Sequence, residues 1–182
     1  FAWDKKLAQL GDSAIKGSSA LRASLLRAWR AEAATVADEA CVEFLWDVQA
    51  FYDSIRVDIL LQQALRLDFP TAPLLLGLQS HLAPRVFKAA GCLSGLVAHT
   101  SRSILAGDLQ SNSLARAMLY RLLDRMNTKY KHCPVYQHVD DLSQVLAHEA
   151  PGKLVRTAVS AAVDLHQGLC SLDIPPSGKS VL

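Results

Sequence analysis

The sequence predicts an α+β fold in which helices back an antiparallel sheet. A short apolar run at residues 41–47 is typical of a buried strand. Strand-like runs also flank the adjacent acids Asp140 and Asp141, which predicts a β-hairpin with both carboxylates near its turn. Segments between and after these runs have helical periodicity, and such helices bury their apolar stripes against the sheet.

Local signals place the elements along the chain. Apolar spacings of three and four predict helices at residues 20–37, 56–67, 74–82, 111–130 and 151–168. Besides the hairpin, apolar and β-branched runs predict strands at residues 41–47, 85–88 and 95–104. Residues 17–19 cap the first helix, along which Leu21 and Leu25 begin an apolar line. The run at 41–47 should be central in its sheet, and Gly168 should end the last helix.

Composition limits the class of protein. With 182 residues, 51% of them apolar and 20% charged, the chain can bury one globular core. The net charge of +2 names no partner, although residues 85–131 hold eight basic residues against two acidic ones. Such a segment suits phosphate backbones, or equally the solvated faces of ordinary helices. The singly spread cysteines favour neither disulfides nor zinc, and no apolar run reaches the roughly 18 residues that span a bilayer, so we expect no membrane partner.

Two stretches resemble the metal-binding motifs of reverse transcriptases. Asp47 ends the first strand, and the aromatic pair Phe51 and Tyr52 follows it before a helix start, as in the family's first motif. His138-Val139-Asp140-Asp141 is similar to the third motif, aromatic-x-Asp-Asp, with histidine in the aromatic position. The 93 positions between Asp47 and Asp140 leave room for the chain to return beside its first strand.

Two further stretches are similar to the family's second and fourth motifs. Gly107 and Ser111 match a Gln-Gly-x-x-x-Ser loop ahead of a long helix, with Ala106 in place of the glutamine. Gly168-Leu169 and Lys179-Ser180 match a Gly-Leu strand that is followed by a Lys-Ser or Lys-Thr pair. By this resemblance, residues 168–173 are expected to form a last strand. The resemblance therefore covers about residues 47–180 in four ordered motifs.

The resemblance implies a fold and a division of the chain. Residues 41–182 would form the polymerase palm, an antiparallel sheet backed by helices, which ends before the thumb. Residues 1–40 would be a mainly helical part of the fingers. Basic residues there either contact template or triphosphate or are ordinary surface cations: Lys16, Arg22, Arg27 and Arg30.

The resemblance also implies the catalytic residues. Asp47, Asp140 and Asp141 would be the catalytic carboxylates and metal ligands, with Asp47 and Asp140 as the firm ligands and Asp141 as a looser one. The main-chain carbonyl of Val48 would be a further metal contact. Carboxylate and carbonyl oxygens are the ligands that Mg²⁺ prefers, so we expect two Mg²⁺ ions, with Mn²⁺ as a substitute.

Substrate contacts follow by the same resemblance. They are assigned to Val48, Phe51, Tyr52, Gly107, Gln110 and Lys179. Tyr52 matches an aromatic that blocks a 2′-hydroxyl, and Asp53 stands one position beyond the carboxylate of RNA-copying RNA polymerases, which favours deoxynucleotides. Gln110 would replace the missing glutamine from a register four positions away. Lys179 would protonate or screen the departing pyrophosphate.

The implied function is that of an RNA-directed DNA polymerase from a retroelement of the non-LTR retrotransposon or group II intron-like type. Its partners would be an RNA template, a DNA primer and deoxynucleoside triphosphates, in an intracellular setting such as the nucleus. An alternative is a decayed or domesticated relative that binds nucleic acid without catalysis. Ala106 and His138 favour this alternative, whereas the three intact aspartates favour catalysis. A third interpretation is an unrelated helical protein whose motifs match by chance.

Overall fold

The computed structural model describes the 182-residue chain except for residues 1, 8, 10, 16–17, 97–100 and 181–182. The chain divides into two compact units. One unit comprises Phe1–Phe51 and Leu119–Leu182, and the other comprises Tyr52–Met118. Antiparallel strands and helices occur together, so the predicted α+β class is confirmed.

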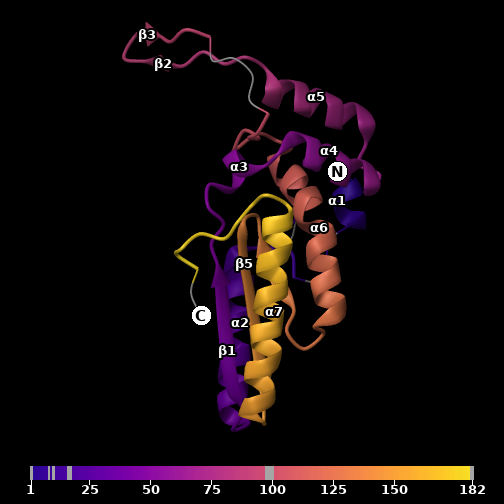
Figure 1. Ribbon diagram of the computed structural model, residues 1–182, viewed down its shortest axis with the longest axis vertical. Coiled ribbons are helices and arrows are strands. Elements are labelled where there is room, and N and C mark those ends of the chain that lie inside the picture. The colour runs from indigo at the N-terminus through magenta and orange to yellow at the C-terminus, as the bar shows by residue number, and fades with distance from the viewer. Residues whose placement is uncertain (1, 8, 10, 16–17, 97–100, 181–182) are drawn as a thin grey trace. The chain divides into compact units, whose positions relative to one another are not determined.

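The first unit contains a three-stranded antiparallel sheet. Its strands are β1 (Ala40–Trp46), β4 (Val135–His138) and β5 (Asp141–His148), in the order β1-β5-β4. Figure 1 shows β1 and β5 side by side. The predicted hairpin is confirmed, because Val139 and Asp140 alone connect β4 to β5, with Val139 at φ 61°.

The predicted central position of the first strand is wrong for the described residues. β5 is the central strand, since it pairs with both β1 and β4. Along β1, burial alternates at the end nearest Asp47: Phe44 is 7% exposed and Leu45 is 43% exposed. The apolar run thus reflects β-propensity more than burial on two faces.

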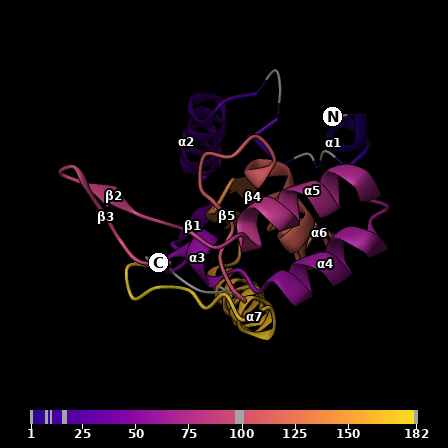
Figure 2. The same ribbon diagram turned by 90° about the horizontal axis from the view of Figure 1, so that it is seen from above.

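Two helices cover opposite faces of the sheet. α2 (Ala20–Val36) and α7 (Pro151–Ser171) both contact β1 and β5, and Figure 2 shows the strands between them. Glu43 points toward α2, because its carboxylate lies 3.5 Å from the Arg27 Nε atom. Side chains alternate along a strand, so Leu45 shares the α2 face, and Phe44 and Trp46 point to the α7 face.

The first predicted helix is confirmed, but its large apolar side chains do not face the sheet. Ser19 caps α2, and its hydroxyl accepts a hydrogen bond from the Arg22 N–H at 3.2 Å. Ala34 is the one buried residue of α2. The large apolar side chains of α2 are exposed: Leu21, Leu25, Leu26, Trp29 and Val36. Arg27, rather than a large apolar side chain, reaches the sheet from this helix, where it pairs with Glu43.

The last helix continues beyond its predicted end. α7 runs to Ser171, so both the predicted stop at Gly168 and the predicted strand at residues 168–173 are wrong. Gly168 is buried inside the helix, where a Cβ atom would collide with a methyl group of Leu122. Leu122 belongs to α6 (Ser111–Lys129), which confirms the long helix predicted from residue 111. Glycine therefore serves helix packing here rather than helix termination.

We expect Gly168→Val to lower the free energy of unfolding by about 1–3 kcal/mol, because the added side chain overpacks the contact with Leu122. Denaturant titration would measure this change. Gly152→Ala is the matched control in the same helix, since nothing lies within 4 Å of the added Cβ atom. The control should be neutral or slightly stabilising. Equal stability of the two variants would contradict the packing role of Gly168.

The second unit is mainly helical. It holds α4 (Val57–Arg66) and α5 (Thr71–Leu82), which confirm two predicted helices, together with most of α3 (Phe51–Ser54) and the start of α6. A short hairpin joins β2 (Lys88–Ala89) to β3 (Cys92–Leu93). The core of this unit contains Ile55, Leu60, Leu74, Ile104, Leu114 and Met118.

The strand predicted at residues 95–104 is not found in its described part. Residues 97–100 lie outside the described residues, and residues 101–104 contain only an isolated bridge between Arg102 and Arg56. The remaining helix of the chain, α1 (Ala2–Lys6), belongs to the first unit. Among the described helices, none combines the length and the hydropathy of a membrane span.

Candidate functional site

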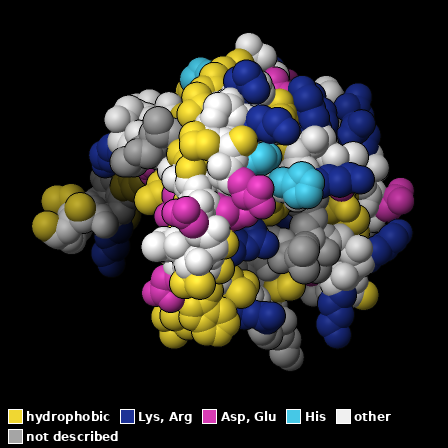
Figure 3. All heavy atoms as spheres, turned by 90° about the horizontal axis from the view of Figure 1, so that it is seen from below, with side chains coloured by type: hydrophobic (Ala, Val, Ile, Leu, Met, Phe, Trp, Pro, Cys, Tyr) yellow, Lys and Arg dark blue, Asp and Glu magenta, His cyan; other side chains and the backbone are white. Residues whose placement is uncertain are grey.

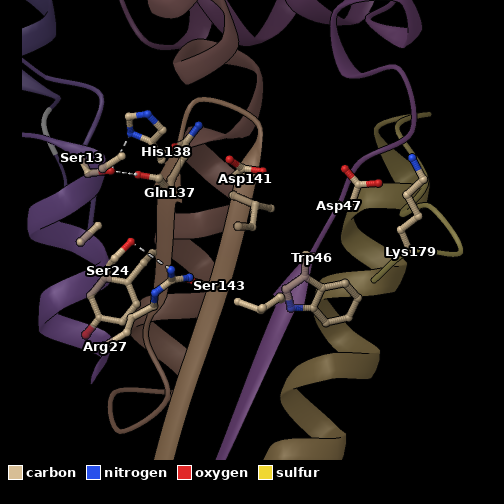
Figure 4. Close-up of a pocket in the computed structure, with 15 residues that line it drawn as sticks. Ser13, Ser24, Arg27, Trp46, Asp47, Gln137, His138, Asp141, Ser143 and Lys179 are labelled. Carbon is tan, nitrogen blue, oxygen red and sulfur yellow. Dashed lines mark hydrogen bonds between the residues drawn. The ribbon is translucent and has the colours of Figure 1, made fainter. Parts of the chain in front are cut away.

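Asp47 and Asp141 lie opposite each other at the end of the sheet where the turn joins β4 to β5. Asp47 directly follows β1, and Asp141 begins β5. Trp46 pairs with Leu142, so the next step of the antiparallel register brings Asp47 opposite Asp141. Both side chains share the α2 face of the sheet with Leu45. Figure 4 shows the two carboxylates at the same end of the pocket that they line.

Asp140 lies in the turn beside them, and the charges of both carboxylates affect its pKa. Burial raises the pKa of Asp140 above its ordinary value, and the negative charges of Asp141 and Asp47 raise it further. A hydrogen bond from its own backbone and the nearby His138 offset part of this effect. The three predicted catalytic carboxylates therefore form one electrostatic cluster, in which like charges repel.

The donor chemistry of this cluster fits a divalent cation. Carboxylate oxygens are hard ligands, and a bound cation would relieve the repulsion that raises the pKa of Asp140. In the part of the chain that the structure describes, no three Asp, Glu, His or Cys side chains converge tightly enough to form a ready-made metal cage. Asp140 and Asp141 could join Asp47 in holding a cation after rotation of their own side chains, aided by water or substrate oxygens as Mg²⁺ usually is.

A C-terminal segment orients Asp47. The Ser177 hydroxyl donates a hydrogen bond to the Asp47 carboxylate, and the Ser177 N–H donates to the Asp47 carbonyl at 2.7 Å. The Ser180 hydroxyl accepts from the Asp47 N–H at 3.2 Å. Val48 and Pro176 form an isolated antiparallel bridge beside these bonds. The sequence pointed to this segment only through the Lys179-Ser180 pair and gave no sign of Ser177.

The pocket in front of the carboxylates measures about 340 Å³ and has a mixed lining. α2 contributes Ser24 and Arg27, and the C-terminal segment contributes Lys179. Its volume lies within the range of small-molecule sites. Two cations and two carboxylates thus line one space, so the formal charges of its lining balance, and a ligand with several negative oxygens would need a bound cation to offset the carboxylates. Arg27 was one of four basic candidates in the sequence, and the pocket singles it out.

His138 and Tyr136 form the β4 side of this pocket. The Nδ1 atom of His138 lies 2.9 Å from the hydroxyl oxygen of Ser13, and the Ser13 N–H donates to the Gln137 carbonyl at 2.9 Å. The Arg30 guanidinium stands 5.0 Å from the centre of the Tyr136 ring. The sequence carried no signal for Ser13, because its contact is 125 positions distant.

The predicted substrate residues divide between the two units. Val48 and Phe51 belong to the first unit and are buried, at 5% and 2% exposure, so their side chains pack inside it. Lys179 is exposed and lines the pocket. The second unit holds Tyr52 and Gly107, together with Gln110.

In the second unit, these residues have distinct settings. The Tyr52 hydroxyl donates to Asn112 Oδ1 at 3.1 Å. Gly107 is exposed with φ 83°, a conformation that favours glycine. The Gln110 carboxamide packs against Gly77 rather than projecting freely. Their roles as substrate contacts stay predictions.

A second cavity of about 550 Å³ lies at the opposite end of β5, beside the start of α7. Its charged and histidine residues are of mixed type: Glu39, His132, His148, Glu149, Lys153 and Arg156. Figure 3, which views the molecule from below, shows acidic, basic and histidine side chains close together on one face. Because its charges largely balance, this cavity favours no single class of ligand.

Neither a protein-family model nor a curated protein sequence matches this chain.

Proposed function

We propose that this chain is the palm, with part of the fingers, of an RNA-directed DNA polymerase of retroelement origin. It would join deoxynucleotides to the 3′-hydroxyl of a primer that is paired with an RNA template. The observation that supports this most is the register that sets Asp47 opposite Asp141, next to Asp140 in the turn. The resemblance in four ordered motifs gives this carboxylate cluster its chemical meaning.

The chemistry is an in-line displacement at phosphorus. Two bound Mg²⁺ ions would supply activation of the 3′-hydroxyl and neutralisation of the charge on the triphosphate. Asp47, Asp140 and Asp141 would hold them, with the Val48 carbonyl as a further contact. Ser177 and Ser180 fix the orientation of Asp47, which limits the rearrangement needed at the moment of reaction.

The cations of the pocket would act on the phosphates. Lys179 and Arg27 line the same space as Asp47 and Asp141. Each cation can therefore attract the phosphate oxygens of a triphosphate that also meets metal ions held by the carboxylates. Lys179 would screen or protonate the departing pyrophosphate. Arg27 is already partly engaged, because its Nε atom lies 3.5 Å from Glu43, and phosphate would compete with that carboxylate.

One observation favours the alternative, a nucleic-acid-binding module without catalysis. α2 lies over the same sheet face that carries Asp47 and Asp141, and the cavity left beneath it is about 340 Å³. That volume suits a nucleotide, whereas a duplex needs far more room. Catalysis on a primer–template at these carboxylates would therefore require α2 to move, whereas a module that binds nucleic acid outside this cavity would not require it.

Primer extension tests the proposal against this alternative. The protein is given an RNA template, a DNA primer, deoxynucleotides and Mg²⁺, beside an Asp140→Ala, Asp141→Ala double variant. We expect the wild type to extend the primer and the double variant not to extend it. Both proteins should bind the RNA template with similar affinity. Template retention without extension by the wild type would instead favour the binding module. Absence of both activities would contradict both functions.

Thermal or denaturant unfolding gives a readout that does not depend on activity. Mg²⁺ at ten times its dissociation constant should raise the free energy of unfolding by about 1.4 kcal/mol, since it binds the folded chain only. The double variant should show no such gain. A gain of equal size in both proteins would place the cation elsewhere and contradict the assigned ligands.

A further inference from the structure

His81 holds a loop of the second unit through a backbone hydrogen bond. The residue lies in the last turn of α5 and is fully buried. Its Nδ1 atom accepts a hydrogen bond from the Leu105 N–H at 3.0 Å. Because an accepting Nδ1 carries no proton, the neutral ring must carry its proton on Nε2.

The environment keeps the His81 ring neutral. Burial lowers the pKa of His81, the positive charge of Arg85 lowers it further, and the negative charge of Asp108 acts in the opposite direction. Arg85 also donates to the His81 carbonyl at 2.7 Å, which ties it to the end of α5. The Nδ1 lone pair is therefore available to Leu105 at neutral pH.

Leu105 is the fixed point from which the exposed loop extends. Its carbonyl accepts a hydrogen bond from the Ser111 hydroxyl, and its N–H is held by His81. Gly107 lies between Leu105 and Ser111 in the sequence. It is exposed, and nothing lies within 4 Å of the position of an added Cβ atom. The position of this tip thus depends on how Leu105 is held.

A second contact joins the same loop to α5, one helical turn earlier. The space that a side chain at Gly77 would occupy is filled by the Gln110 carboxamide oxygen. Residues 77 and 81 share one face of the helix, so both ends of the loop rest on that face. Within the described residues, His81 Nε2 and Gln110 Oε1 are buried without a hydrogen-bond partner. Packing therefore holds the Gln110 carboxamide oxygen, and packing together with the hydrogen bond to Leu105 holds the His81 ring.

We propose that the α5 face formed by Gly77 and His81 positions the loop of residues 105–111, and that His81 is thereby a positioning residue for substrate binding. The inference rests on the proposed function, because the resemblance behind that proposal assigns Gly107 and Gln110 of this loop to contacts with nucleotide or template. His81 itself would touch neither. Its effect is to hold the Leu105 N–H, and through it the Gly107 tip, in one place.

Three variants of His81 test the hydrogen bond. His81→Asn keeps an acceptor near the place of Nδ1, His81→Gln moves it toward Nε2, and His81→Leu removes it. We expect His81→Leu and His81→Gln to raise KM for deoxynucleotide or template about tenfold with a smaller change in kcat, as for one lost backbone hydrogen bond. His81→Asn should restore KM. Equal KM values in all three would overturn the proposal.

Gly77→Ala tests the contact between Gly77 of α5 and Gln110 of the loop without weakening the helix. Alanine raises helix propensity, so stability should hold, while the new Cβ atom displaces the flexible end of Gln110. We expect an increase in KM at unchanged or higher stability. A variant with wild-type KM would show that Gln110 need not pack against α5 and would contradict the role of Gly77 in positioning the loop.

Amide hydrogen exchange separates this inference from the proposed function. The Leu105 amide should be protected in the wild type and in His81→Asn, and should exchange faster in His81→Leu, whether or not the protein extends primers. Protection that is unchanged in His81→Leu would overturn the anchor even if extension occurs. Failure of the wild type to extend a primer, with the expected exchange pattern, would reject the proposed function and leave the loop anchor established.

Discussion

Asp47→Asn should lower the rate of primer extension at least about 10³-fold, which corresponds to about 4 kcal/mol of transition-state stabilisation. The substitution removes one negative charge from the carboxylate cluster while keeping the size of the side chain. Its amide oxygen can still accept the hydrogen bond from Ser177. The loss would therefore report charge and metal binding rather than a disordered strand end. Single-turnover extension at saturating deoxynucleotide would measure it.

Asp38→Asn is the matched control for this change. Asp38 is exposed in the turn after α2 and has φ 56°, a conformation that asparagine adopts readily. The control should keep full activity and stability. Asp47→Asn should also fold normally, because it removes like-charge repulsion with Asp140. Retention of more than a tenth of the wild-type rate by Asp47→Asn would contradict a catalytic role for this carboxylate.

Local signals in the sequence were sufficient for the hairpin and for most helices. Residues that favour strands stand on both sides of Asp140 and Asp141, and a two-residue connection leaves little choice of topology. The chain spacing after Asp47 allowed the first strand to pair with the hairpin. The sequence could not tell which strand would be central, because β-branched and apolar residues are common in edge strands too.

The errors arose where a distant residue determines the outcome. Gly168 resembles a helix stop until Leu122 is placed against it, and the two are 46 positions apart. Ser177 orients Asp47 from 130 positions away and leaves no local pattern. The apolar line of α2 suggested an inward face, yet Leu21 and Leu25 are exposed, and Arg27 reaches Glu43 of the sheet instead. Long-range packing supplied each of these features, and a single sequence does not encode it in any short window.

Tyr52→Val should increase the use of ribonucleotides relative to deoxynucleotides about 10- to 100-fold. By resemblance, the Tyr52 ring occupies the space that a 2′-hydroxyl would need, and valine is too short to fill it. The ring is held in place, since its hydroxyl donates to Asn112 Oδ1 at 3.1 Å and its carbonyl accepts from the Ile104 N–H at 2.9 Å. Competing incorporation of the two nucleotide classes on one template would measure the ratio.

Two controls separate the ring from its neighbours. Tyr52→Phe keeps the ring and loses the hydrogen bond to Asn112, so it should keep most of the discrimination. Asp53→Asn should change little, because the Asp53 carboxylate accepts a hydrogen bond from the Ser103 hydroxyl at 3.2 Å and is thereby directed toward that residue. If Asp53→Asn altered the ratio and Tyr52→Val did not, the carboxylate would be the selecting group. The proposed active site would then resemble that of polymerases that accept the 2′-hydroxyl, and the expected preference for deoxynucleotides would be wrong.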